Sequence, residues 1–174
     1  MAKLTIIKYG DSVLRKKTRN LLLEEINTNN SIIRTLAYNM IDTMQCAEGV
    51  GIAAPQVGIS LSLCIIKTPQ DLSQTLVMIN PKITFKNNNK TCCQEGCLSL
   101  PGIYEDVNRF SEVICEYINL DCKHCIIEAR GLLSRIIQHE VDHLNAKLFI
   151  DYLSQCKKLQ INKIFKTRKQ NGLL

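Results

Sequence analysis

The sequence predicts an α+β domain, in which antiparallel strands pack around a central helix that carries an H-E-x-x-H pattern, with an N-terminal and a C-terminal helix. Apolar residues recur at three- and four-residue spacing in two segments, 33–44 and 131–144, which is typical of amphipathic helices. Between them lie short extended runs separated by turn signals. An order of helix, several strands, helix and tail helix is typical of the α+β class.

The first helix should follow Asn29-Asn30-Ser31, a cluster typical of an N-cap, and should end near Glu48-Gly49. A glycine-rich loop is expected after it, over residues 49–58. The apolar face of this helix is expected to consist of Ile33, Leu36, Ala37, Met40, Ile41 and Met44.

Extended runs bounded by Asn, Gly and Pro predict the strands. Asn87-Asn88-Asn89 is a turn signal, after which the chain should return as a partner strand. The expected strands cover residues 61–67, 75–79, 82–86, 90–94 and 111–120.

The second helix is expected over 131–144 and the third in the tail, residues 152–174. The tail helix would place Ile161, Ile164 and Phe165 on one side. The tail has no acidic residue, so its basic residues account for the whole net charge of +6. These residues, which should lie largely in solvent, are Lys157, Lys158, Lys163, Lys166, Arg168 and Lys169.

Length and composition indicate one folded domain covering residues 1–174. A chain of 174 residues can bury roughly two-thirds of its unfolded surface, and 45% apolar with 22% charged residues is ordinary for a globular protein. The N-terminus lacks the apolar run of a signal peptide. The uncharged stretch 49–66 contains a proline and three glycines, which argues against a membrane helix. We therefore expect a cytoplasmic protein with no membrane segment.

Nine cysteines are many for such a chain, but their odd number and the missing export signal argue against a disulfide framework. We expect mostly buried thiols and at least one metal ligand. Cys122-Lys123-His124-Cys125 would hold a structural metal only with two more ligands, and Cys115 is the nearby candidate. Cys92 and Cys93 should point to opposite faces of a strand, with Cys93 a candidate for lining a pocket.

The second helix contains His139-Glu140-Val141-Asp142-His143, an H-E-x-x-H pattern. Its histidines lie on one face, about 6 Å apart along the axis, so both imidazoles can reach one metal ion. Glu140 flanks that ion and can take a proton from metal-bound water and pass it on. Leu132 and Ile136 on the same face favour a sheltered site over the alternative, two surface histidines on a charged face.

Two histidines need a third ligand to complete a catalytic site. The chain has no histidine after His143 and no glutamate after Glu140, which leaves Asp151 on that side. Upstream, Cys97 follows Gly96 and precedes a Pro-Gly turn, so its thiolate can face the helix from a strand end. A thiolate with two imidazoles leaves one position open for water. Taken alone, Cys97 would more often be a core thiol.

Three segments resemble the signature motifs of peptide deformylases, in the same order and at similar separations. They are Gly49-Val50-Gly51-Ile52-Ala53-Ala54-Pro55-Gln56, Glu95-Gly96-Cys97-Leu98-Ser99 and Gln138-His139-Glu140-Val141-Asp142-His143. The likeness covers nearly the whole chain and includes residues 11–15, 79–81 and 148–154. It departs from the family at Gly10, where Pro is frequent, at Ala146, where Gly is common, and at Lys123-His124, where a turn Gly is expected.

The resemblance implies that Cys97, His139 and His143 bind one divalent ion, typically Fe(II) in the cell, with Ni(II), Co(II) or Zn(II) able to replace it. It implies metal-dependent hydrolysis of the N-formyl group of N-formylmethionyl nascent polypeptides, with release of formate. Metal-bound hydroxide would attack the formyl carbon, with Glu140 as general base and acid. Gln56 and the backbone N–H of Leu98 would donate hydrogen bonds to the formyl oxygen as it becomes an oxyanion.

The family also implies that the peptide binds as an added strand beside the glycine-rich loop, with its Met side chain in an apolar pocket. The substrate-binding residues implied are Val50, Gly51, Glu95, Gly96, Leu132 and Ile136. For Val50, Leu132 and Ile136, ordinary core packing is at least as good an interpretation of the sequence.

We expect a monomer, and we hypothesise that the basic tail contacts ribosomal RNA or the nascent-chain exit region. A merely solvated tail helix is the alternative. Two rival functions remain at this point. One is a small metallopeptidase with Asp151 or Cys97 as third ligand; the other is a binding protein with a structural metal, which would have no need of Glu140.

Overall fold

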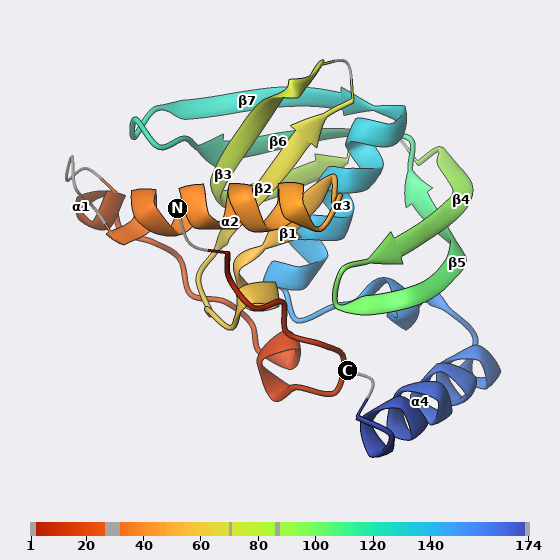
Figure 1. The fold of residues 1–174 in the computed structure, drawn as a ribbon. Helices are drawn as coiled ribbons and strands as arrows, with labels where there is room; N and C mark the ends of the chain where they lie inside the picture. The colour runs from red at the N-terminus through yellow and green to blue at the C-terminus, as the bar shows by residue number, and fades with distance from the viewer. Residues whose placement is uncertain (1–2, 27–31, 70, 86–87, 173–174) are drawn as a thin grey trace.

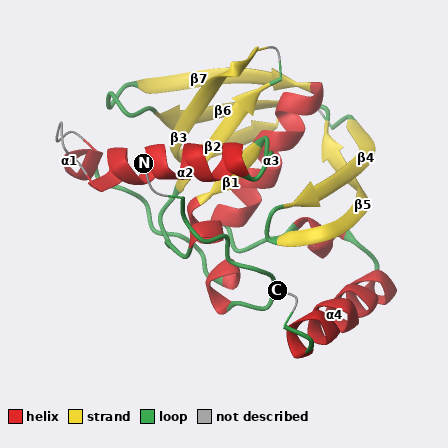
Figure 2. Cartoon of the chain, in the orientation of Figure 1, coloured by secondary structure: helices red, strands yellow, loops and turns green. Residues whose placement is uncertain are grey.

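The computed structural model describes residues 3–26, 32–69, 71–85 and 88–172 and has the expected α+β architecture (Figure 1). Two antiparallel sheets and four α-helices make up this part of the chain (Figure 2). The expected N-cap Asn29-Asn30-Ser31 and the turn residue Asn87 lie outside the described residues.

The larger sheet has five strands in the order β1-β2-β3-β6-β7, all antiparallel to their neighbours. Its strands are β1 (Gly51–Ala53), β2 (Leu63–Thr68), β3 (Asp71–Phe85), β6 (Glu112–Ile118) and β7 (His124–Arg130). Strands β1 and β7 fall in segments where none was predicted.

Strand β3 replaces the two strands predicted at 75–79 and 82–86, so that division was wrong. Its first half pairs with β2 and its second half with β6, with an irregularity between Ile79 and Lys82. There Asn80 adopts a φ of 51°, and Pro81 has no N–H to donate to a ladder. The turn-like residues mark the point where the strand changes partner.

The smaller sheet consists of β4 (Lys90–Cys97) and β5 (Leu100–Phe110). A strand at 90–94 was predicted, but as the partner of the strand before the asparagine turn. That pairing is wrong, because β4 pairs with β5 along its whole length. Strand β5 itself was not predicted, since Pro101 and Gly102 near its start resemble a turn.

Helix α2 (Ile32–Cys46) follows the short α1 (Leu23–Ile26). Five of the six residues predicted for the apolar face of α2 are buried, and Ile41 packs partly buried at the edge of the same core. This core also takes in side chains of β1, β2 and β3. The 3-10 helices η1 (Ser12–Arg15), η2 (Ala54–Val57) and η3 (Phe149–Tyr152) complete the connections.

Helix α3 (Gly131–Leu144) carries the H-E-x-x-H pattern and contacts strands of both sheets. Eleven of its fourteen residues are buried, although its composition is amphipathic. Its apolar side chains pack against the larger sheet, and its polar ones meet the smaller sheet and the loops around it. The apolar part of α3 consists of Leu133, Ile136, Ile137, Val141 and Leu144.

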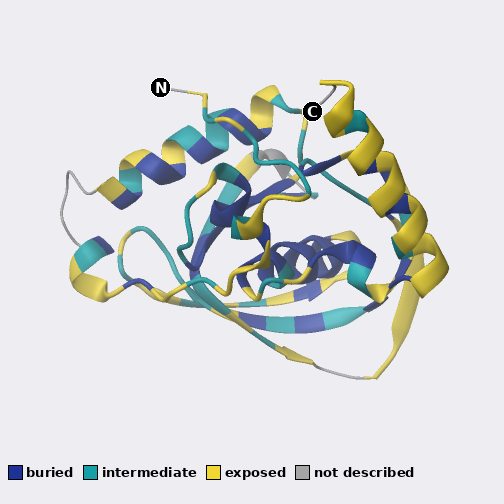
Figure 3. Cartoon of the chain, turned by 90° about the horizontal axis from the view of Figure 1, so that it is seen from below, coloured by how far each residue is buried: buried dark blue, intermediate teal, exposed yellow. Residues whose placement is uncertain are grey.

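Helix α4 (Gln155–Gln170) is capped by Ser154, whose side chain accepts a hydrogen bond from the Lys157 N–H. Ile161 and Phe165 are buried against β5 and η3, whereas Ile164 is 40% exposed. The predicted apolar side therefore holds for two of its three residues. The outer surface of α4 is exposed (Figure 3).

The basic side chains of α4 are less uniform than predicted. Lys157 pairs with Glu105, and Arg168 donates a hydrogen bond to the carbonyl oxygen of Pro101. Three others are exposed: Lys163, Lys166 and Lys169. Of the helices in the described residues, none has the length and apolar content needed to cross a membrane.

Candidate metal centre and pocket

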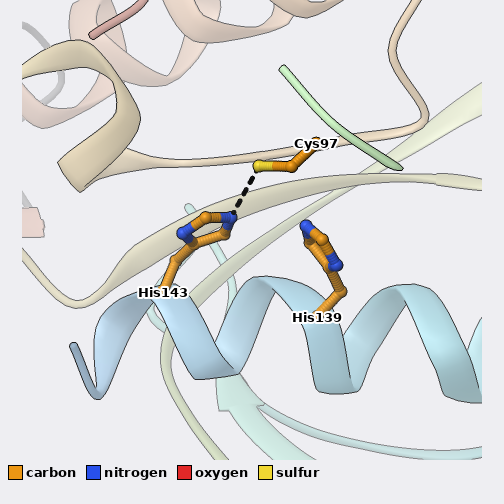
Figure 4. A group of neighbouring side chains, drawn as sticks. All are labelled: Cys97, His139 and His143. Atoms are coloured by element: carbon orange, nitrogen blue, oxygen red, sulfur yellow. Dashed lines mark hydrogen bonds between the residues drawn. The ribbon is translucent and has the colours of Figure 1, made fainter. Parts of the chain in front are cut away.

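Cys97, His139 and His143 converge where β4 ends above α3 (Figure 4). One ligand atom from each lies within 4.8 Å of the others, and Cys97 Sγ is 3.3 Å from His143 Nε2. Among the residues the structure describes, this is the one group of three or more such side chains suited to an ion. The Cys122-Lys123-His124-Cys125 segment therefore forms no second centre of this kind.

Local structure explains the convergence. The β4–β5 register shifts between Gly96 and Cys97, so Cys97 leaves the regular ladder as the last residue of its strand. A Cβ at Gly96 would lie 2.6 Å from the Tyr104 ring, which occupies the space beside the backbone there. His139 and His143 are one helical turn apart, with ring centroids separated by 5.0 Å.

Asp151, the alternative third ligand, lies elsewhere. Its carboxylate accepts hydrogen bonds from both terminal nitrogens of Arg15, at 2.5 and 3.0 Å, and from the Leu148 N–H. The metallopeptidase variant that uses Asp151 as a ligand is therefore excluded by this structure.

The donor set fits a divalent transition metal. His139 Nδ1 lies 3.0 Å from Glu95 Oε2, which leaves its Nε2 for an ion and matches the usual carboxylate–histidine support of metal sites. Burial lowers the pKa of His143 well below its ordinary value, which favours the neutral imidazole that metals bind. Burial also acts to lower the pKa of His139, but Cys97 and Glu95 outweigh it and raise that pKa.

Glu95 lies at the centre of a buried charge network. Its carboxylate accepts hydrogen bonds from Arg109 Nε and Nη2 at 2.9 and 3.0 Å and from Arg135 Nη1 at 2.7 Å. Arg109 also pairs with Asp142 on α3. Burial acts to raise the pKa of Glu95, but the hydrogen bonds from His139 and Arg109 lower it to about 2.

This network was only partly foreseen. Glu95 was predicted to bind substrate, yet its carboxylate is held by two arginines and His139. Sequence reasoning missed Arg109, Arg135 and Asp142. For Arg135 a signal existed, because it lies four residues before His139 and therefore on the same helical face.

Glu140 is buried beside the glycine-rich segment. A Cβ on Gly51 would lie 2.3 Å from Glu140 Oε1, so the carboxylate rests where a side chain of residue 51 would be. Burial raises the pKa of Glu140 to about 7. A carboxyl group that titrates near neutrality is suited to both accept and donate a proton.

Gln56 on η2 is buried and faces the same centre. Its Oε1 accepts a hydrogen bond from the Ala53 N–H at 2.8 Å, which orients the amide. Its Nε2 lies 3.4 Å from Cys97 Sγ and 3.3 Å from Ser99 Oγ. Leu98 directly follows Cys97 in the sequence and lines the cavity that opens over this centre.

A cavity of about 570 Å³ opens over the centre. Val50 and Leu132 are 47% and 56% exposed, so core packing is excluded for them, while Ile136 is buried. Cys93 is not among the lining residues; it is exposed, and its carbonyl oxygen accepts a hydrogen bond from Arg135. All six residues predicted to bind substrate line the cavity: Val50, Gly51, Glu95, Gly96, Leu132 and Ile136.

A family model, a relative and two solved structures that match this chain all describe peptide deformylases. A family model described as "Polypeptide deformylase" matches residues 3–159. The peptide deformylase of Endomicrobium trichonymphae is 47% identical over 172 residues, covering 99% of each chain. The crystal structure of a peptide deformylase from Legionella pneumophila has a TM-score of 0.87 at 36% identity and covers 98% of each chain. A structure from Acinetobacter baumannii, described as Met-Ala-Ser bound, has a TM-score of 0.80 at 34% identity, covering 87% of this chain and 99% of that one.

Proposed function

Since this chain belongs to the polypeptide deformylase family, we propose that it hydrolyses the N-formyl group of N-formylmethionyl nascent polypeptides and releases formate. One observation carries the proposal: Cys97, His139 and His143 gather at a cavity beside the buried carboxylate of Glu140. A site built only to stabilise the fold would have no need of that carboxylate.

Cys97, His139 and His143 would hold one divalent ion, with Fe(II) as the cellular metal. Ni(II), Co(II) and Zn(II) would fit the same donors, because a thiolate and two imidazoles accept several divalent ions. When bound, the ion supplies a Lewis acid that makes water a nucleophile at neutral pH. Glu95 would act as a positioning residue, since its hydrogen bond to Nδ1 fixes the orientation of His139.

Glu140 would move the proton that hydrolysis requires. Its carboxylate takes a proton from the attacking water and delivers it to the amine nitrogen as the C–N bond to the formyl carbon breaks. The products are formate and a free amino terminus. Glu140 is buried and directly follows His139 in the sequence, which supports this role.

Gln56 and Leu98 would stabilise the charge that develops on the formyl oxygen. The Gln56 amide nitrogen already lies near Cys97 Sγ. The Leu98 backbone N–H lies close to the same atom in the chain, because Leu98 directly follows Cys97. Donors fixed before the reaction need no reorganisation, and removal of one such donor is typically worth about 3 kcal/mol in the transition state.

The substrate peptide would lie along β1. This short strand is an edge strand of the larger sheet, so its free side can pair with an extended peptide. Gly51, in this strand, and Gly96 both line the cavity where the peptide would lie. Val50, Leu132 and Ile136 would form the apolar pocket for the Met side chain.

We further propose that residues 1–174 form one catalytic domain that supplies every residue of the site, and that the protein acts as a monomer. An enzyme for nascent chains would work in the cytoplasm, where ribosomes present them. The exposed lysines of α4 would make salt-sensitive contact with ribosomal RNA or the exit region. These three are Lys163, Lys166 and Lys169.

The test compares N-formyl-Met-Ala-Ser, N-acetyl-Met-Ala-Ser and unmodified Met-Ala-Ser as substrates for anaerobically purified protein. We expect formate and Met-Ala-Ser in equal amounts from the first and no reaction of the other two. Formate would be measured enzymatically and peptides by mass spectrometry, with chelator-treated protein as the control. Cleavage of the Met-Ala bond would instead indicate a peptidase, and absence of formate from metal-loaded protein would exclude the proposed reaction.

A further inference from the structure

Residues 7–9, here called the N-terminal strap, join η2 to the β4–β5 turn, the two segments that carry the proposed oxyanion donors. The Ile7 N–H donates to the carbonyl oxygen of Gln56 at 2.8 Å, and the Tyr9 N–H donates to that of Ser99 at 2.9 Å. Between these two backbone bonds, Lys8 Nζ donates to the carbonyl oxygen of Leu98 at 3.1 Å. The strap therefore ties Gln56 and Leu98 together, although they lie far apart in the sequence.

Lys8 also lines the catalytic cavity. Partial burial lowers the pKa of Lys8, and the nearby Cys97 offsets part of that shift. No salt bridge formed among the described residues includes Lys8. Its positive charge is therefore directed at the cavity and the Cys97–Leu98 segment rather than at a carboxylate.

We propose that Lys8 is a positioning residue of the deformylation reaction: its ammonium group holds Leu98 in place and adds positive charge near the developing oxyanion. The inference rests on the proposed function and deepens it. Neither the H-E-x-x-H pattern nor the cysteine motif includes Lys8, which lies about 90 residues before the loop that it holds.

The physical argument has two parts. The hydrogen bond from Lys8 holds the Leu98–Ser99 peptide plane, directly after the Leu98 N–H, and so limits displacement of the residue that carries this donor. A misplacement of about 1 Å in such a group can slow a reaction about a hundredfold. In addition, a cation that a pocket partly shields from water interacts more strongly with a nearby negative charge than a solvated one does. Since the oxyanion exists only during the reaction, Lys8 should affect kcat rather than KM.

The test uses Lys8→Met, which keeps the aliphatic stem, and Lys8→Arg, which keeps a charged donor. Lys17→Met is the matched control, because Lys17 is exposed and does not line the cavity. With formyl-Met-Ala-Ser, we expect Lys8→Met to lower kcat about tenfold and to change KM less than about twofold. Lys8→Arg should stay within about threefold of the wild type in kcat, and all variants should keep wild-type metal content and Tm.

Inhibition by formate gives a readout that a merely structural role would not change. Formate is an anion formed at the same centre, so loss of the Lys8 charge should raise its inhibition constant about fivefold. Lys17→Met should leave that constant unchanged.

The inference would be overturned by wild-type kcat in Lys8→Met, by a loss confined to KM, or by loss of metal from Lys8→Met. Equal kcat values for Lys8→Arg and Lys8→Met would overturn it as well. The wild type and Lys17→Met separate this failure from that of the function. If both release formate while Lys8→Met matches them, only the role of Lys8 is refuted; if neither releases formate, the deformylase proposal and the role of Lys8 fail together.

Discussion

Gly51→Ala should displace Glu140, the proposed proton carrier, without touching the proposed metal ligands. A Cβ at position 51 would lie 2.3 Å from Glu140 Oε1, 2.8 Å from Cδ and 2.9 Å from Cγ, whereas ordinary contacts begin near 3.4 Å. The carboxylate must therefore move by about 1 Å, a displacement that can slow catalysis about a hundredfold. The φ of Gly51 is not in the left-handed region, so the alanine introduces no backbone strain.

The assay is kcat for formate release from formyl-Met-Ala-Ser, with metal content measured on the same sample. A double-mutant cycle provides the control, because Gly51→Ala should have little further effect once Glu140 has been replaced by Ala. A kcat within about twofold of the wild type would refute the reasoning, since it would mean that the carboxylate can move without consequence. An equal loss in both backgrounds would point to substrate binding instead.

Three further predictions concern other parts of the molecule. The first concerns the proposed ligands, with the variants Cys97→Ala, His139→Ala and His143→Ala. Each variant should lose the ion in elemental analysis, because a site of three protein ligands cannot spare one. A variant that retains stoichiometric metal would show that its residue is not a ligand. The second concerns Asp151: burial acts to raise the pKa of this carboxyl, but Arg15 lowers it below its ordinary value. Ionised Asp151 therefore stabilises the fold at neutral pH, and this stabilisation is lost as pH falls below about 4. Thermal melts should therefore show a smaller loss of Tm between about pH 6 and about pH 3 in Asp151→Asn than in the wild type; equal losses would contradict the assignment. The third concerns the exposed tail lysines, which are Lys163, Lys166 and Lys169. Their replacement by Glu should weaken ribosome binding in sedimentation assays and leave cleavage of short formyl peptides unchanged. Unchanged, salt-independent ribosome binding would exclude the contact.

Charge replacement is preferable to truncation of the tail because of how α4 packs. Ile161 and Phe165 are buried against β5 and η3, so removal of α4 would expose apolar surface next to the cavity wall. A truncated protein could then lose activity through the fold alone. The exposed lysines can be changed without disturbing that packing.

Local patterns predicted the parts of the fold that depend on local forces. The periodicity of residues 33–44 and 131–144 follows from one buried helical face, and both helices are present. Strand pairing depends on distant partners, and there the predictions were wrong. The Asn80-Pro81 step resembled a break between two strands, but in the structure it is where one strand changes partner.

In the site, too, local sequence patterns were predictive and tertiary contacts were not. The spacing of His139 and His143 predicted that both would face one point, and the lack of histidine or glutamate downstream made Cys97 a candidate. Motif resemblance supported Cys97 and added Gln56 and Leu98. The buried network around Glu95 could not be predicted this way, because Arg109 comes from β5, a strand that the sequence did not reveal. Contacts of the N-terminal strap are likewise tertiary and leave no local pattern.

Formate release by metal-loaded Glu140→Ala, compared with the wild type in a single turnover, tests the central claim most directly. Both proteins would be loaded anaerobically with one equivalent of the same ion, and formate would be quantified against bound metal. The account predicts that the wild type releases one formate per chain and that Glu140→Ala keeps its ion but is at least about a hundredfold slower. Formate release by Glu140→Ala at the wild-type rate would contradict it.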